Sequence, residues 1–302
     1  MSDLTGENNG VMSGGWYMRR CPDGEAVEAF YRDGLGLPII RKHVPVWFLW
    51  GGGTLAFELK ADKAPRPERI IEPDAHPLTP ILLTRDLKAA LARAQAAGGK
   101  VVPSRDVMGR EAFVLDGDRQ ITGLRQVDEK LPHHLATPLP GVAGDFNPGC
   151  PPLPADLVSW HSVVRRVRDV AKVAAFYRDV IGFKHLGAHG GREVFRIGQD
   201  MLLEIAPGGS PQVAPVDRGE ITNSWVSRVA DHNALMRRLM HHKVRLAQDV
   251  IQFNSARLVY VLDPEDQVVG LEERYPPEKY QWASRTPFPE DTEALRRFAA
   301  RP

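Results

Sequence analysis

Apolar and polar residues follow two patterns along this chain, and the patterns recur in a fixed order. Short apolar runs such as residues 80–84 and 256–262 have the length and composition of buried strands. Between such runs, Val27, Phe30 and Tyr31 are spaced to lie on one face of a helix that Asp23 is suited to cap and Gly36 to end. Three strand-like runs with glycine turns follow, so the first segment predicts a βαβββ unit.

The same order appears again 146 residues later. Residues 15–37 and 161–183 agree at 10 of 23 positions without a gap, and both contain Phe-Tyr-Arg-Asp, at 30–33 and at 176–179. The offset persists downstream, where Glu58 falls opposite Glu204. A repeat of this length indicates two copies of a whole domain.

Each copy also contains a second unit of the same kind, so the chain predicts four βαβββ units. In the second copy the first unit has strands at 183–188, 193–197 and 201–205. The second unit of copy one comprises strand 80–84, helix 87–97 and strands near Val101, at 112–115 and at 120–125. In copy two it comprises strand 224–229, helix 234–241 and strands near Val244, at 256–262 and at 268–273. Mixed strands and helices of this kind predict the α+β class.

The domain boundaries follow from composition. We expect a flexible tail over residues 1–13, a first domain over 14–128, a linker rich in proline and glycine over 129–156, a second domain over 157–275, and a tail over 276–302 with a short helix at 290–300. The length of 302 residues suits two domains.

Charge and cysteine content restrict the partners. The formal net charge is +1, which gives no global field toward nucleic acid or an anionic membrane. Two cysteines provide no disulfide framework, the first residues lack the apolar core of a signal peptide, and no apolar run approaches the ~18 residues needed to span a bilayer. We therefore expect a cytoplasmic protein that binds neither nucleic acid nor a membrane.

Residues 261–271, VLDPEDQVVGL, form a turn and strand that are similar to those of a known superfamily. Together with the repeated Phe-Tyr-Arg-Asp motif, and with the weaker VLDGDRQITGL at 114–124, this closing turn and strand resemble the vicinal-oxygen-chelate superfamily of glyoxalases, bleomycin-resistance proteins and extradiol dioxygenases. The resemblance implies two tandem domains, each with a curved mixed sheet around a cavity, as in two-domain extradiol dioxygenases, where the second domain is the active one. It also implies that the partner is a small organic molecule and that the protein is a monomer or homodimer.

The resemblance also implies where a metal would bind. Metal-dependent relatives take ligands from the first, fourth, fifth and eighth strands of a domain. Here those positions hold Trp16, Glu58, Thr79 and Gly123 in the first copy, and Ser162, Glu204, Ser224 and Gly270 in the second. A transition metal needs about three His, Cys or carboxylate ligands, so we expect the usual site to be lost and no cofactor to be bound.

A second possibility keeps a metal. If a bulge turns His161 inward, then His161, Glu204 and Glu272 could hold Fe, Mn, Zn or Ni in an irregular site. The protein would then be a metal-dependent dioxygenase or lyase.

Without a metal, two functions compete. In a dioxygenase-like or lyase/isomerase-like enzyme acting on an aromatic or carbonyl compound, Glu204, Glu272 or His161 would act as acid or base, with the pKa of Glu204 raised by an apolar cavity. Other cavity positions would bind substrate, namely Ser162, Arg166, Ser224, Gly270, Glu58 and Trp16. The rival is a non-catalytic binder of the bleomycin-resistance type.

Each of these residues also has a structural interpretation. Glu204 could be hydrogen-bonded within the sheet, Arg166 paired with an acidic neighbour at a strand end, and His161 packed at a domain edge. Gly270 and Gly123 would leave room in the cavity wall. An enzyme should bury a carboxylate or histidine that only substrate neutralises, whereas a binder should show an apolar, aromatic cavity.

Overall fold

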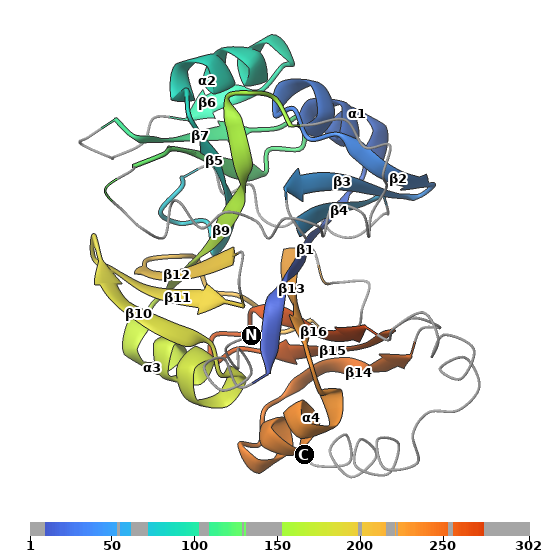
Figure 1. The fold of residues 1–302 in the computed structure, drawn as a ribbon, viewed down its shortest axis with the longest axis vertical. Helices are drawn as coiled ribbons and strands as arrows, with labels where there is room; N and C mark the ends of the chain where they lie inside the picture. Colours follow the sequence, from blue (N-terminus) through green and yellow to red (C-terminus); the bar gives the residue numbers. More distant parts are fainter. Residues whose placement is uncertain are drawn as a thin grey trace, which may run out of the picture.

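The computed structural model describes residues 10–52, 55–61, 72–102, 109–128, 130, 153–198, 201–215, 221, 223–252 and 256–274. It confirms the α+β class and the four βαβββ units (Figure 1). The first unit contains β1 (Val11–Cys21), α1 (Gly24–Ala29), β2 (Ile39–His43), β3 (Val46–Gly52) and β4 (Leu55–Ala61). The second contains β5 (Leu78–Thr84), α2 (Leu87–Ala96), β6 (Lys100–Val102), β7 (Glu111–Leu115) and β8 (Ile121–Gln126).

The second half repeats this order. Its first unit contains β9 (Leu157–Val167), α3 (Val170–Ala175), β10 (Lys184–His189), β11 (Arg192–Ile197) and β12 (Met201–Pro207). Its second contains β13 (Asn223–Val229), α4 (His232–His241), β14 (Leu246–Gln252), β15 (Ala256–Leu262) and β16 (Val268–Arg274). The expected helix at 290–300 lies outside the described residues.

All four helices begin at an aspartate, as the sequence predicts for the first. The side chains of Asp23, Asp86, Asp169 and Asp231 each accept a hydrogen bond from the backbone N–H three residues later, which satisfies one of the unpaired donors of the first turn. The Phe-Tyr-Arg-Asp motif then forms a π-helical turn in both copies, at Phe30–Gly34 and Phe176–Ile181.

One strand prediction is wrong in position. The strand expected near Val244 begins at Leu246 instead. The Val244 N–H donates to the Leu239 carbonyl, and Lys243 has a φ of 53°, so these residues close the C-terminus of α4 and cannot yet extend the sheet.

The pairing of the units corrects the expectation that each half closes its own sheet. Sheet A has the order β14-β15-β16-β13-β1-β4-β3-β2, and sheet B has the order β10-β11-β12-β9-β5-β8-β7-β6. Each sheet therefore joins one unit of the first half to one unit of the second, through the antiparallel pairs β1–β13 and β5–β9. All four units present the same kind of first strand as an edge, so the repeat alone could not say which edges pair.

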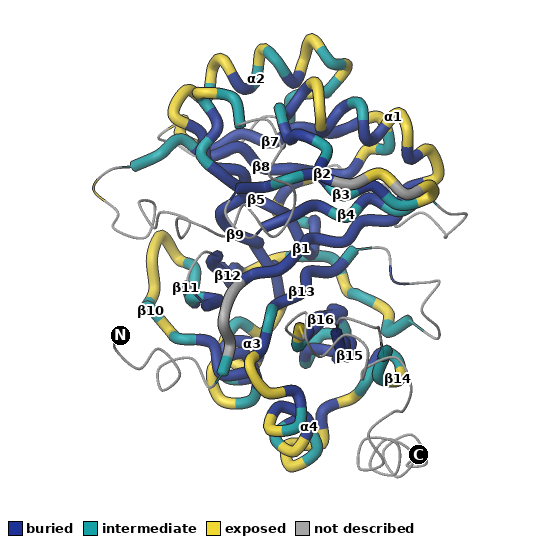
Figure 2. The backbone as a smooth tube through the Cα atoms, turned by 45° about the vertical axis from the view of Figure 1, so that its right-hand side comes forward, coloured by how far each residue is buried: buried dark blue, intermediate teal, exposed yellow. Residues whose placement is uncertain are grey.

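The halves remain recognisable on the helix side. Helices α1 and α2 lie at one end of the molecule, α3 and α4 lie at the other, and the joining strands run between them (Figure 1). The helices expose their outer residues, whereas the central strands are buried (Figure 2). One apolar core contains helix-facing residues from all four units, including Phe30, Leu82, Val163 and Trp225.

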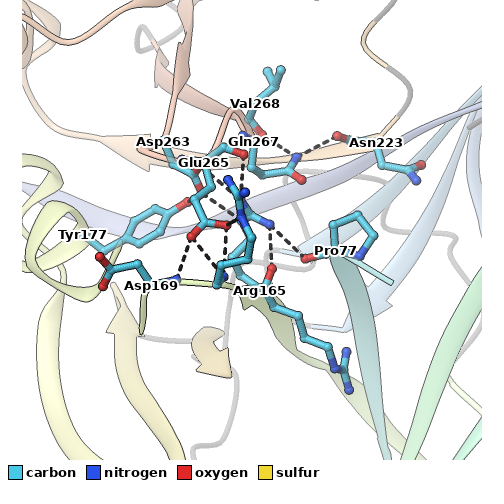
Figure 3. A network of polar contacts seen from close by, with 11 residues as sticks. Pro77, Arg165, Asp169, Tyr177, Asn223, Asp263, Glu265, Gln267 and Val268 are labelled. Atoms are coloured by element: carbon cyan, nitrogen blue, oxygen red, sulfur yellow. Dashed lines mark hydrogen bonds and ion pairs between the residues drawn. The ribbon is translucent and has the colours of Figure 1, made fainter. Parts of the chain in front are cut away.

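Two buried ion pairs tie the units of each half together on this side. Arg19 of β1 pairs with Asp116 in the β7–β8 turn, and Arg165 of β9 pairs with Asp263, Nε to Oδ2 2.8 Å, in the β15–β16 turn. The Tyr177 hydroxyl also donates to Asp263, at 3.1 Å (Figure 3). The repeated arginine is thus part of the scaffold, since its charge is matched within the core.

Candidate functional site

Sheets A and B each have a second face that no described helix covers, and the expected site positions lie on these helix-free faces. Because the units pair across the halves, the eight positions regroup. Sheet A carries Trp16, Glu58, Ser224 and Gly270, and sheet B carries Thr79, Gly123, Ser162 and Glu204. The grouping by sequence half was therefore wrong, although the strands on which these residues lie were predicted correctly.

Neither group suits a metal. Each contains a single carboxylate, and the described residues contain no group of three or more His, Cys, Asp or Glu side chains that could hold an ion. Glu204 lies on β12 in sheet B and Glu272 on β16 in sheet A, so the irregular His161–Glu204–Glu272 site does not form. The pairing of β5 with β9 does shift register between Ser162 and Trp160, and buried His161 sits in that irregularity.

The helix-free face of sheet B holds a closed ring of charges. Arg125 bonds Glu111, Nε to Oε2 2.8 Å, and Glu204, Nη2 to Oε2 3.0 Å. Arg192 completes the ring, with Nη1 2.7 Å from Glu204 and Nη2 3.1 Å from Glu111. The Ser162 hydroxyl donates to Glu204 at 3.0 Å. Two guanidinium groups therefore stand around the carboxylate that would otherwise be available for a metal or a proton.

This ring overturns the expected chemistry of Glu204. Burial alone would raise its pKa, but Arg125 and Arg192 hold the pKa of Glu204 well below its usual range. The same two arginines lower the pKa of Glu111 against its burial. A carboxylate held ionised in this way is a poor general acid and a weak base, so the hydrogen-bonded structural interpretation of Glu204 is the one the geometry supports.

The two glycines do not leave empty space. A methyl group at Gly270 would lie 2.6 Å from Val226 Cγ2 and 2.9 Å from Tyr260 Cε1, and one at Gly123 would collide with Ile81 and approach Phe113. Tyr260 and Phe113 are the antiparallel partners of these glycines. In each sheet an aromatic ring from the neighbouring strand covers the glycine, which corrects the expectation of a gap in the cavity wall.

The helix-free face of sheet A is apolar and aromatic. Its buried cluster includes Trp16, Met18, Val226 and Tyr260. Two residues of the segment after β12 contribute to it: Ile221 is a member of the cluster, and Ala214 packs against it. The Tyr260 hydroxyl reaches from β15 to the Met18 sulfur on β1, at 3.7 Å, so its ring crosses the middle of the face. Glu58 is half-buried on the same face, paired in register with Met18 and with Phe48, which also packs there.

Two hydrogen-bond donors on this face stand out. Among the described residues, neither Trp16 Nε1 nor Ser224 Oγ has a hydrogen-bond partner, and the two residues are 8% and 0% exposed. The register pairs Trp16 with Val226 and Met18 with Ser224, so the two donors are diagonal neighbours, with Cα atoms ~7–8 Å apart. Orphaned buried donors are costly unless something satisfies them.

Glu272 is the acidic group of sheet A, and its environment differs from that of Glu204. It lies on β16 two residues beyond Gly270 and is paired in register with Leu258 and Arg228. Burial raises its pKa, and Arg274, whose Nε lies 3.1 Å from Oε2, offsets this only in part. Burial therefore biases Glu272 toward the protonated form, in contrast to Glu204.

Three residues of the charge ring were missed in the sequence, and one signal could have found one of them. Glu272 lies two residues past Gly270 on the same strand face. The same step from Gly123 leads to Arg125. Glu111 and Arg192 carry no such signal, because they lie on strands that supply no family ligand.

The comparisons with known proteins agree with this fold. Residues 15–119 match the model described as the Glyoxalase/Bleomycin resistance protein/Dioxygenase superfamily. A mutant of glyoxalase I from Zea mays superposes with a TM-score of 0.60 at 15% identity, over 89% of this chain and 96% of that one. A proposed dioxygenase from Bacillus subtilis superposes with a TM-score of 0.56 at 14% identity, over 95% and 94%. No curated protein sequence matches this chain.

At these identities the solved structures establish the fold and not the activity. No helix in the described part of the chain has the length and apolar character needed to cross a membrane. The superfamily model matches part of the first half of the chain, and the second half repeats the same βαβββ units, so the chain resembles the vicinal-oxygen-chelate superfamily and has a tandem, four-unit form of its fold.

Proposed function

We propose that the protein binds a small, planar organic molecule on the helix-free face of sheet A. The observation that carries this proposal is the pair of buried donors without described partners, Trp16 Nε1 and Ser224 Oγ, within an otherwise apolar lining. A ligand that places an oxygen acceptor between them would satisfy both groups. A carbonyl, phenolate or carboxylate oxygen has the required lone pairs.

The lining favours an aromatic ligand. Phe48, Trp50 and Tyr260 accompany Trp16 in or against the same cluster, and their flat, rigid faces suit a ring of similar shape. Tyr260 already occupies the middle of the face, so a ligand must stack beside its ring or displace it. A cytoplasmic location and a monomeric or homodimeric state remain predictions from the sequence.

Glu272 supports a second candidate function, that of an enzyme. A buried carboxyl with a raised pKa on the ligand-binding face could donate a proton to a bound carbonyl oxygen, or take one from a neighbouring carbon. Its contact with Arg274 partly neutralises it, so we place binding first and acid–base catalysis second.

A titration with matched variants tests binding. Thermal shift and intrinsic fluorescence would be followed with a panel of aromatic aldehydes, ketones and carboxylates. We expect Trp16→Phe and Ser224→Ala to weaken binding by about tenfold each, because each removes one donor to the ligand. The controls are Trp225→Phe and Ser227→Ala, which also carry buried donors without described partners but lie on β13 facing the helices.

The outcomes separate the candidates. Equal loss of binding in the control variants, or no loss in Trp16→Phe and Ser224→Ala, would contradict a site on this face. Recovery of the ligand unchanged after long incubation would indicate a binder. Conversion that disappears in Glu272→Gln while binding persists would indicate the enzyme.

A further inference from the structure

On the helix-free face of sheet B, the buried cation Arg166 lies outside the charge ring. The four members of the ring balance one another, two arginines against two glutamates. Arg166 lies on the same helix-free face and is 3% exposed. It forms an ion pair with Asp74, whose Oδ1 lies 3.7 Å from Nε on a side chain that is 57% exposed to solvent. The counter-charge of Arg166 is therefore distant and well hydrated compared with those inside the ring.

The surroundings hold the guanidinium in place. Thr79 Oγ1 lies 3.4 Å from Nη1 and 3.5 Å from Nδ1 of the buried His76. The Arg166 Cζ atom lies 5.9 Å from the centre of the Phe113 ring, which forms an apolar floor. Burial, with help from Arg192, lowers the pKa of Arg166 to about 10, so the group remains charged at neutral pH.

An open groove of about 520 Å³ adjoins this arginine, and its lining is acidic. The groove is lined by Glu72, Asp74, Ala75, Gly209 and Ser210. Asp74 belongs both to the groove and to the contact with Arg166. The rim is fixed by backbone hydrogen bonds, from Gly209 N–H to the Asp74 carbonyl at 2.8 Å and from Ser210 N–H to the Ala75 carbonyl at 2.7 Å. The groove therefore has two acidic residues in its lining, and one of them, Asp74, is also the ion-pair partner of the buried Arg166.

We propose that this groove binds a small amino carboxylate, a molecule with an ammonium group at one end and a carboxylate at the other. The ligand carboxylate takes the place of Asp74 at Arg166, whose planar fork suits bidentate binding, and the Thr79 hydroxyl adds a neighbouring polar group. The ligand ammonium pairs with Asp74 and Glu72. Neither end alone fits, because the acidic mouth repels a simple anion and a simple amine leaves Arg166 with its distant partner.

The site is independent of the one proposed on sheet A. It lies on the other sheet and shares no residue with the aromatic face. Failure of either proposal would leave the other standing.

Isothermal titration of the full chain tests the proposal. The probes are glycine, β-alanine and 4-aminobutyrate, compared with acetate and butyrate, and with ethylamine and butylamine. We expect at least one amino carboxylate to bind about tenfold more tightly than the acid and the amine of matched length. Equal binding of a simple carboxylate, or no binding of any amino carboxylate, would overturn the proposal.

The variants assign the contacts. We expect Arg166→Gln to abolish binding, and Asp74→Asn and Glu72→Gln to weaken it, because each removes one of the proposed charges. The control is Arg20→Gln, which removes the buried arginine 146 residues earlier, on sheet A, and should leave binding unchanged. If Arg166→Gln fails to fold, the variants at the exposed positions Asp74 and Glu72 still test the proposal. Unchanged affinity in both of those variants would overturn the assignment.

Discussion

At the scale of single residues, glycine and its cross-strand aromatic neighbour act as one feature. Gly270 and Gly123 occupy positions from which relatives are expected to reach a metal. Here a ring from the adjacent strand lies over each of them, Tyr260 and Phe113 respectively. The missing side chain accommodates a protein ring, so the wall of each face is completed from within the sheet.

This feature predicts a cost for adding one methyl group. Gly270→Ala should destabilise the fold by about 1–3 kcal/mol, because the new Cβ would lie 2.6 Å from Val226 Cγ2 and 2.9 Å from Tyr260 Cε1. Chemical denaturation would measure the change. The control is Gly117→Ala, where a Cβ would meet nothing within 4 Å. Equal stability of the two variants would show that the tyrosine ring moves aside readily.

At the scale of elements, sheets A and B have equivalent positions with opposite chemistry. Glu204 on β12 lies within a ring of two arginines, whereas its repeat partner Glu58 on β4 is half-buried beside Met18 and Phe48. The ring links β7, β8, β11 and β12, so it joins strands from both halves of the chain. We interpret it as a structural tie across the helix-free face of sheet B.

The charge ring predicts that the same substitution lowers the free energy of unfolding by different amounts at the repeat-related positions Glu204 and Glu58. Glu204→Gln should lower the free energy of unfolding by about 3 kcal/mol at neutral pH, because it leaves the buried Arg125 and the partly buried Arg192 with one carboxylate between them. Glu58→Gln should cost much less, since Glu58 is only half-buried. Urea denaturation of both variants would measure the difference. Similar small costs would contradict a structural role for the ring.

The charge ring also predicts that the stability of the fold decreases in acid. The folded-state pKa values of Glu204 and Glu111 are lowered, so their contribution to stability is present above the ordinary glutamate pKa and is lost as pH falls through the folded-state values. The gap between the wild type and Glu204→Gln should therefore shrink in acid. A gap that stays constant from neutral to strongly acid pH would contradict this account.

The sequence predicted the elements well and their partners poorly. The four helices and most strands follow from local patterns, such as the apolar run that forms β15. The pairing of β1 with β13 could not be read, because four similar first strands offer equivalent edges. The lowered pKa of Glu204 could not be predicted from the sequence either. It depends on Arg125 and Arg192, which lie 79 and 12 residues away in the chain and contact Glu204 only in the folded sheet.

At the scale of the whole molecule, the halves are not independent. Both sheets take strands from both halves, and the helix-facing core contains residues from all four units. Opening either half would expose the edge strands and core of the other. The 146-residue repeat thus describes the origin of the chain more closely than its units of stability.

This architecture predicts one cooperative unfolding transition. Calorimetry should give a single peak with calorimetric and van't Hoff enthalpies of similar size. Leu82→Ala in the first half and Val163→Ala in the second, both fully buried, should lower the temperature of that same peak. Two resolved peaks, each shifted by only one of the variants, would show that the halves unfold separately.

The most direct test of the central claim uses the six tryptophans as reporters. A two-dimensional nitrogen–proton NMR spectrum would record their indole N–H signals during titration with an aromatic carbonyl or carboxylate ligand, with Trp16 assigned from Trp16→Phe. Because Trp16 Nε1 lies buried on the helix-free face of sheet A without a described partner, its signal should shift most as it gains an acceptor. Saturable ligand binding that leaves the Trp16 signal in place would contradict the assignment of the site to this face.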